Sequence, residues 1–208
     1  MKKLLTAIAL ATLAASAGAQ VSFSGGIDRA GLVGVNPNGP AGTLLNVGGK
    51  ESAVVNTSAG MLTATFLGFE ALDTDTFTFS LGSGTLSNKG TVGDSISGIV
   101  GAGMLDFTFR DQFAGSMIGN GQNLGDFTSY AVLGSFAGSV FTPFTLGGAY
   151  DLIIGFNDGL RVDADYDDMV IGLRVVSVPE PESYALMLAG LVAVGFIARR
   201  RQHGRSQT

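Results

Sequence analysis

The sequence predicts an all-β body that folds as an antiparallel sandwich or a jelly-roll-like domain. Polar and apolar residues alternate over Asp75–Leu81 and over Leu105–Arg110, which is the period of a strand with one buried face. Groups of glycine, asparagine and proline interrupt the body at near-regular intervals, and no segment of it has a long helical period. Short strands separated by frequent turns are typical of antiparallel sandwiches and barrels.

The N-terminal end of the chain, residues 1–19, has the layout of a secretory signal peptide. Lys2 and Lys3 precede an apolar run over Leu4–Ala15, and Ala17-Gly18-Ala19 fits the small-residue pattern of a cleavage site. The run lacks the polar face of an amphipathic helix, which argues against a buried helix of the fold. We therefore expect export through the Sec translocon and removal of this segment.

The body that remains, residues 20–177, contains further segments rich in β-branched and aromatic residues. We expect four of them to be strands: Thr63–Phe69, Ser129–Phe136, Tyr150–Phe156 and Met169–Val176. Pieces rich in glycine and asparagine predict turns at Asn36–Pro40, Gly82–Gly84 and Gly119–Gly121. The 32 glycines of the chain fit many tight turns rather than a collagen-like or linker composition.

The body is acidic, with six basic and fifteen acidic residues and hence a net charge of −9. The whole chain has a net charge of only −5, because the other lysines and arginines lie near its two ends. Scattered cations do not neutralise a run of phosphates, so we expect no nucleic-acid binding. The chain contains no cysteine, so packing, with any help from bound ions, must stabilise it without disulfides.

Little in the sequence supports catalysis. The one histidine, His203, lies in the C-terminal tail, so the body has no Ser-His-Asp triad and no histidine-ligated zinc site. The absence of cysteine excludes a thiol nucleophile, and no phosphate-binding glycine motif follows a predicted strand. A pair of carboxylates that cleaves glycosides is the catalytic option that remains. We expect a protein without enzymatic activity.

The C-terminal segment, residues 178–201, combines three features. A Pro179-Glu180-Pro181 triplet is followed by an uncharged run over Tyr184–Ala198 and then by Arg199-Arg200-Arg201. As a helix the run is about 22 Å long, which is shorter than the ~30 Å apolar core of a bilayer, but long arginine side chains extend the effective span. Cationic residues favour the cytoplasmic side. We expect a transmembrane helix over 184–198, a cytoplasmic polar tail over 202–208, and the acidic body outside.

This segment resembles a PEP-CTERM sorting signal, in which the triplet, a short apolar helix with glycines and a basic cluster follow one another. The resemblance implies an exported protein of Gram-negative bacteria that make extracellular polymer, and processing by an exosortase-type membrane protease. The residues that carry the signal are Pro179, Glu180, Pro181, Arg199, Arg200 and Arg201. The polar extension Gln202–Thr208 departs from the many members that end sooner. A permanent membrane anchor is the alternative interpretation.

One stretch of the body is unusually acidic, with six aspartates from Asp151 to Asp168. Ca²⁺ takes six to eight oxygen ligands in flexible geometry, and a cluster of carboxylates in a turn provides such ligands. The spacing of positions 163, 165 and 167 resembles the start of a Ca²⁺ loop. An EF-hand pattern nevertheless fails, because Asp168 and Arg174 stand where glycine and glutamate are needed.

The same stretch is similar to a motif, F-x-D … D-x-D-Y-x-D-M-V, that is found near the end of many exported PEP-CTERM proteins and related β domains. The resemblance implies a shared turn before the final strand, with five candidate calcium ligands: Asp158, Asp163, Asp165, Asp167 and Asp168. Asn157 departs from the motif, where an acidic residue is usual, and this would weaken a metal site. Aspartates also cap ordinary surface turns, so a turn without an ion is the other interpretation.

These features lead to two functional hypotheses. The first is an exported structural or interaction protein, held transiently in the inner membrane and then resident in the cell envelope, at the surface or in the extracellular matrix. The second is a module whose aspartate turn binds calcium and, with exposed aromatics such as Tyr166, contacts extracellular polysaccharide. Calcium-dependent retention on polysaccharide would distinguish the second hypothesis from the first.

Overall fold

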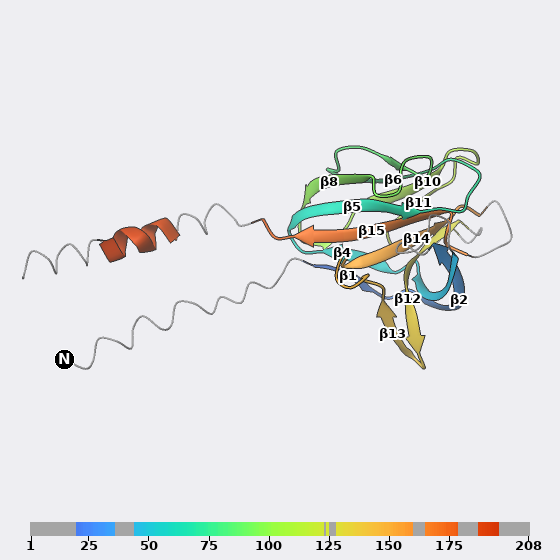
Figure 1. Cartoon of the computed structure of the whole chain (residues 1–208), viewed down its shortest axis with the longest axis horizontal. Coiled ribbons are helices and arrows are strands. Elements are labelled where there is room, and N and C mark those ends of the chain that lie inside the picture. Colours follow the sequence, from blue (N-terminus) through green and yellow to red (C-terminus); the bar gives the residue numbers. More distant parts are fainter. Residues whose placement is uncertain are drawn as a thin grey trace, which may run out of the picture. The chain divides into compact units, whose positions relative to one another are not determined.

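The computed structural model describes residues 20–35, 44–122, 124, 128–159, 165–178 and 187–195. The chain divides into two compact units, residues 1–177 and 178–208. Fifteen strands lie in the described part of the first unit (Figure 1). The first eight are β1 Val21–Ser24, β2 Ile27–Val35, β3 Leu44–Glu51, β4 Val54–Thr57, β5 Gly60–Gly68, β6 Asp75–Phe79, β7 Leu86–Ser87 and β8 Ser95–Val100. The others are β9 Gly103–Met104, β10 Phe107–Asp111, β11 Met117–Gly119, β12 Ser129–Ala137, β13 Val140–Pro143, β14 Leu152–Asn157 and β15 Met169–Val176.

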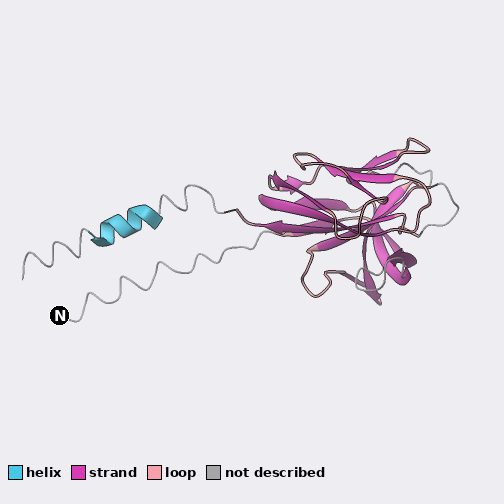
Figure 2. Ribbon diagram, turned by 45° about the horizontal axis from the view of Figure 1, so that its top comes forward, coloured by secondary structure: helices cyan, strands magenta, loops and turns pink. Residues whose placement is uncertain are grey.

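These strands form three antiparallel sheets. The largest has the order β2-β3-β12-β14-β15-β5-β8, and β13 pairs with β12 in a hairpin. A four-stranded sheet has the order β11-β10-β6-β7, and a three-stranded sheet has the order β1-β4-β9. The regular elements described in the first unit are strands, and the described helix belongs to the second (Figure 2). The all-β, antiparallel class predicted from the sequence is therefore confirmed.

One face of the largest sheet packs against the two smaller sheets around a shared apolar core. Alternate residues of β5, namely Leu62, Ala64 and Phe66, are fully buried in this core, as the period of a strand requires. From the four-stranded sheet, Phe109 of β10 stacks on Phe156 of β14, with ring centroids 4.9 Å apart. Figure 1 shows β6 and β10 as a layer over β5 and β15. Side chains of the two layers interdigitate, as in a β-sandwich.

The opposite face of the central strands is also buried. A second apolar cluster contains Leu133 of β12, Ile153 of β14 and Val170 of β15, and the loop residues Phe144 and Tyr150 pack against it. All six residues of β14 are consequently buried. A strand covered on both faces reads as a continuous apolar run. For this reason β14 is recognisable in the sequence by its residue types and not by alternation.

The predicted strands coincide with observed ones. β15 has the predicted bounds, β6 and β10 overlap the two alternating segments, and β5, β12 and β14 overlap the remaining three. The turns predicted at 82–84 and 119–121 lie between strands or at a strand end. The turn predicted at 36–40 falls outside the described residues.

Strands β2 and β3 are not predicted by the sequence pattern, because glycines interrupt it. A Cβ at Gly48 of β3 would lie 2.5 Å from the ring of Phe136 on β12. A Cβ at Gly49 would lie 2.7 Å from the Leu32 side chain on β2. These glycines leave room for large side chains of the neighbouring strands. As a result, β3 has few of the β-branched and aromatic residues that mark a strand in a sequence.

The described part of the C-terminal unit contains a helix over residues 187–195. It falls inside the predicted transmembrane segment 184–198, whose two ends lie outside the described residues. No helix in the described part of the chain combines the length and the apolar character that a membrane-crossing segment requires. The predicted transmembrane helix therefore stays a prediction.

Candidate functional site

Acidic residues gather where the chain enters β15. Asp165–Asp168 directly precede this strand, and Glu70 lies just beyond the end of the neighbouring strand β5. The two strands are antiparallel, with Val170 opposite Gly68, so the start of one lies beside the end of the other. The pairing continues beyond the strands, since the Glu70 N–H donates to the Asp167 carbonyl at 2.8 Å. The register of the two strands thus places Glu70 beside residues Asp165–Asp168, which we call the aspartate segment.

Three carboxylates meet at this point. One oxygen each of Glu70, Asp167 and Asp168 lies within 4.8 Å of the other two. Asp167 and Asp168 are buried, whereas Glu70 is exposed. A Ca²⁺ ion binds oxygens at about 2.4 Å, so it can bridge two oxygens that are about 4.8 Å apart. The three side chains have the spacing to share one cation.

Asp167 has the most demanding surroundings of the three. The residue is 0% exposed, and neither of its carboxylate oxygens has a hydrogen-bond partner in the described part of the chain. Burial raises the pKa of Asp167 to about 8, and the carboxylates of Asp165, Asp168 and Glu70 add to the rise. An ionised carboxylate at this position needs a compensating positive charge.

A second buried carboxylate, Asp75, lies at the start of β6. Its Oδ2 accepts a hydrogen bond from Asn88 Nδ2 at 3.0 Å, while its Oδ1 has no partner among the described residues. Burial raises the pKa of Asp75 to about 8, and the carboxylates of Asp158, Asp168 and Asp111 raise it further. Carboxylates of the β14–β15 connection therefore raise the pKa of a carboxyl group in the four-stranded sheet.

The aspartate segment is held in place by an unusual backbone turn. Tyr166 has a φ of 59°, a left-handed conformation that is uncommon for a residue other than glycine. Its ring is buried, and its hydroxyl accepts a hydrogen bond from Ser129 Oγ at 2.8 Å. A Cβ at Gly155 of β14 would lie only 2.2 Å from the Tyr166 carbonyl oxygen. Asp168 Oδ2 accepts from the Asp158 N–H at 2.7 Å, which ties the two ends of the β14–β15 connection together.

The segment that carries Glu70 is fixed by Lys89. The Lys89 ammonium donates to the carbonyls of Ala71 and Leu72, at 3.2 and 2.8 Å. It also lies 5.4 Å from the centre of the Phe69 ring, in a cation–π arrangement. Its positive charge lowers the pKa of Asp75, against the larger effects that raise it. Lys89 thus positions the end of β5 and partly offsets the acidic field.

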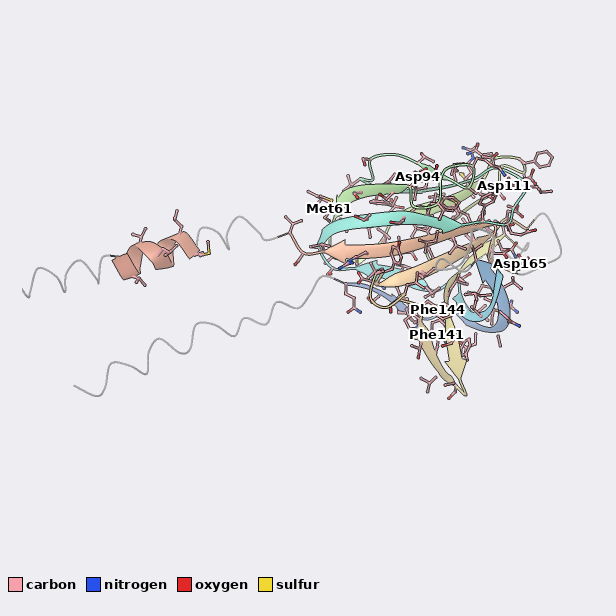
Figure 3. All side chains as sticks on the ribbon, viewed as in Figure 1. Met61, Asp94, Asp111, Phe141, Phe144 and Asp165 are labelled. Atoms are coloured by element: carbon pink, nitrogen blue, oxygen red, sulfur yellow. The ribbon has the colours of Figure 1, made fainter. Side chains whose placement is uncertain are left out.

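The structure brings together some of the predicted calcium ligands. Asp167 and Asp168 belong to the three-carboxylate group, and Asp165 lies near enough to raise the pKa of Asp167. Asp158 contributes its N–H to Asp168. Asp163 lies outside the described residues. A calcium ion at this set of five therefore stays a prediction. Figure 3 shows Asp165 and Asp111 at one end of the β body and Met61 at the other.

Glu70 and Asp75 are missed by sequence reasoning, because they are far in sequence from the aspartate segment. For Asp75 a signal exists. It falls on the same face of its strand as Phe77 and Phe79, and therefore on the buried side. Its partner in the register is Asp111, which lies on the same face of β10 as the buried Phe107 and Phe109. The sequence therefore shows that each of these two strands has an aspartate in phase with its apolar residues, which predicts a buried acid.

One expectation about this stretch is corrected. Tyr166 is 1% exposed, so the expectation of an exposed aromatic at this position is wrong. The physical reason is the left-handed turn, which places the ring in the second apolar cluster. Asp151 accepts hydrogen bonds from the N–H groups of Val21 and Val175, at 3.1 and 2.9 Å. It joins β1 to β15 and does not belong to the three-carboxylate group.

The residues of the predicted sorting signal, from Pro179 to Pro181 and from Arg199 to Arg201, lie outside the described residues. Residues 177–202 match the family model of the PEP-CTERM protein-sorting motif. The chain therefore carries this motif at its C-terminal end, which supports an exported protein that is processed by an exosortase. No curated protein and no solved structure matches the chain.

Proposed function

We propose that this protein, which carries the PEP-CTERM protein-sorting motif, is an exported structural or interaction protein of the cell surface or extracellular matrix. The observation that carries the proposal is the motif match at residues 177–202. The signal-peptide pattern at 1–19 supports it, because a chain with both signals is translocated first and sorted by its tail afterwards.

The order of events follows from the properties of the segments. The leader brings the chain to the Sec translocon and is removed. The apolar run over 184–198 then holds the chain in the inner membrane, with the three arginines on the cytoplasmic side. Pro179 and Pro181 are residue types that disfavour a helix, and a non-helical junction suits recognition by a protease. Cleavage by an exosortase near the triplet transfers the β body to the surface or matrix.

We assign the β body a structural or interaction role rather than a catalytic one. It lacks cysteine, and the one histidine of the chain is in the tail that processing removes. Its two apolar clusters bury the central strands on both faces, which gives a rigid body suited to residence outside the cell. The fold alone assigns no ligand to this body.

Calcium-dependent binding of extracellular polysaccharide is the second candidate function. The group formed by Glu70, Asp167 and Asp168 favours it, because Glu70 is exposed and a cation there would be accessible to sugar hydroxyls. Retention of the protein on polysaccharide beads in calcium, and its release by a chelator, would support this function. Glu70→Gln should then abolish retention, whereas Asp106→Asn, at an exposed acid elsewhere, should not. Retention that is unchanged by the chelator would exclude it.

Sorting is tested by substitution of the triplet in the producing cells. Pro179, Glu180 and Pro181 are all replaced by alanine, and a matched control replaces His203 and Gln207 in the polar extension. We expect the triplet variant to accumulate in the membrane at the mass of the uncleaved tail, while the control is released like the wild type. Equal release of both variants would contradict exosortase processing at this motif.

A further inference from the structure

We propose that Glu70, Asp167 and Asp168 form a Ca²⁺ site that joins the end of β5 to the start of β15. This ligand set differs from the aspartate set suggested by the sequence, because it takes Glu70 from a distant segment. The inference concerns the β body and is independent of the sorting motif, so it stands or falls separately from exosortase processing.

The spacing of the carboxylates is the first argument. Three oxygens, one from each side chain, lie within 4.8 Å of one another, which a single Ca²⁺ ion can bridge at its usual bond lengths. Three acidic side chains at this spacing repel one another when ionised, and a shared cation removes that repulsion.

The state of Asp167 is the second and independent argument. Its carboxylate is completely buried, and both of its oxygens lack a hydrogen-bond partner among the described residues. Buried polar groups are almost always satisfied, so a carboxylate with two unsatisfied oxygens calls for a ligand. One of these oxygens belongs to the group shared with Glu70 and Asp168 and is therefore directed to the same point. A cation at that point satisfies the side chain that the protein leaves unsatisfied.

The chemistry of the donors selects the ion. All three donors are carboxylates, the ligand type that Ca²⁺ and Mg²⁺ prefer, and the body contains neither cysteine nor histidine for a softer metal. Glu70 is exposed and can adjust its position, and its exposed side leaves room for water ligands. Ca²⁺ accepts such flexible, mixed coordination, whereas Mg²⁺ demands near-ideal octahedral geometry and loses its waters reluctantly. The site therefore suits Ca²⁺.

The position of the site implies that the ion connects two neighbouring strands. β5 and β15 are neighbours in the largest sheet, and their pairing contains a bulge next to Val170. An ion held by Glu70 on one side and by Asp167 and Asp168 on the other clamps the sheet just beyond this bulge. Lys89 already fixes the carbonyls of Ala71 and Leu72, so the Glu70 segment is held for binding.

The proposal is tested by calorimetric titration of the chelator-treated full-length chain with CaCl₂ and by thermal unfolding with and without calcium. We expect one bound ion per chain from this site. At a hundredfold excess of calcium over Kd, the melting temperature should rise by about 5–10 °C. Absence of both binding heat and a melting shift at millimolar calcium would overturn the proposal. So would an equal shift with the same concentration of MgCl₂ or with salt of matched ionic strength.

Two variants locate the ion. Glu70→Gln changes an exposed side chain and should weaken calcium binding at least tenfold without changing the melting temperature in chelator. Asp167→Asn keeps the shape of the buried side chain but cannot ionise, so in chelator it should melt at or above the temperature of the wild type, yet lose the response to calcium. Asp106→Asn, an exposed control, should keep that response. Full calcium binding in both Glu70→Gln and Asp167→Asn would place the ion elsewhere and contradict the proposal.

Discussion

The side chain of Asn120 completes the hydrogen bonding of Val55, in the manner of a strand partner. Asn120 Oδ1 accepts from the Val55 N–H at 2.8 Å, and Asn120 Nδ2 donates to the Val55 carbonyl at 2.6 Å. The same amide nitrogen donates to the carbonyl of Leu105 at 2.7 Å. One buried amide thus links β4 of the three-stranded sheet to the turn after β11 and to the approach to β10. It links the two smaller sheets to each other.

Replacement of Asn120 by alanine should therefore destabilise the body. The N–H of Val55 and the carbonyl of Leu105 would each lose a buried partner, so we expect a loss of about 2–4 kcal/mol in the free energy of unfolding. Denaturant unfolding measures this loss. Asn56→Ala is the control, since Asn56 is only half-buried and donates to its own strand at 3.3 Å. Equal effects of the two substitutions would show that the Asn120 amide is not a structural link.

The hydroxyl of Tyr130 belongs to the same network. It accepts from the Gly121 N–H at 2.6 Å and contacts Asn120 Oδ1 at 3.0 Å and the carbonyl of Ala53. Burial raises the pKa of Tyr130 to about 12, so the hydroxyl remains protonated at neutral pH. Tyr130→Phe should cost about 1–3 kcal/mol of stability. Combined with Asn120→Ala it should cost clearly less than the sum of the single losses, and strict additivity would contradict a shared network.

Gly155 is predicted to be essential for the aspartate segment. An added methyl group would lie 2.2 Å from the Tyr166 carbonyl oxygen, so Gly155→Ala should push Asp165–Asp168 away from β14. We expect a lower melting temperature and weaker calcium binding together. Gly101→Ala is the matched control, because a methyl group there meets nothing within 4 Å. Calcium affinity in Gly155→Ala equal to that of the control would mean that the segment does not depend on this close contact.

Asp75 predicts how stability depends on pH in the absence of calcium. Its pKa in the folded protein, about 8, exceeds the ordinary value of 3.8, so the folded state binds this proton more tightly than the unfolded state. Its contribution is present at low pH and is lost as pH rises from about 4 to 8, by up to about 1.4 kcal/mol per pH unit. Denaturation in chelator should show a smaller decline for Asp75→Asn than for the wild type. Identical slopes would show that Asp75 is not the titrating group, and would leave Asp167, whose pKa burial also raises to about 8.

How far the fold can be predicted depends on how each strand is buried. β6 and β10 have one apolar face and alternate clearly, and β15 is marked by its β-branched and apolar residues, with bounds that the sequence predicts correctly. β2 and β3 are hidden because glycines at positions such as Gly48 make room for aromatic neighbours. A glycine that serves packing between strands removes the apolar residue that would have marked the strand.

The candidate site shows the same limit. Asp167 and Asp168 stand in a conspicuous acidic run, so the sequence suggests them directly. Glu70 is an isolated acid whose importance arises only from the register of β5 against β15. The burial of Tyr166 depends on a left-handed backbone conformation, which no side-chain pattern in this segment indicates. The acidic run in the sequence predicts a carboxylate site, but only the pairing of β5 with β15 determines which carboxylates lie together.

The intact mass of the protein purified from its own producing cells tests export and processing most directly. Membrane and extracellular fractions are measured separately. We predict an extracellular or envelope species that begins near Gln20 and ends close to Pro179–Pro181. A membrane-bound species that still contains Arg199–Arg201, with no shorter form outside the cell, would contradict processing and make the C-terminal segment a permanent anchor.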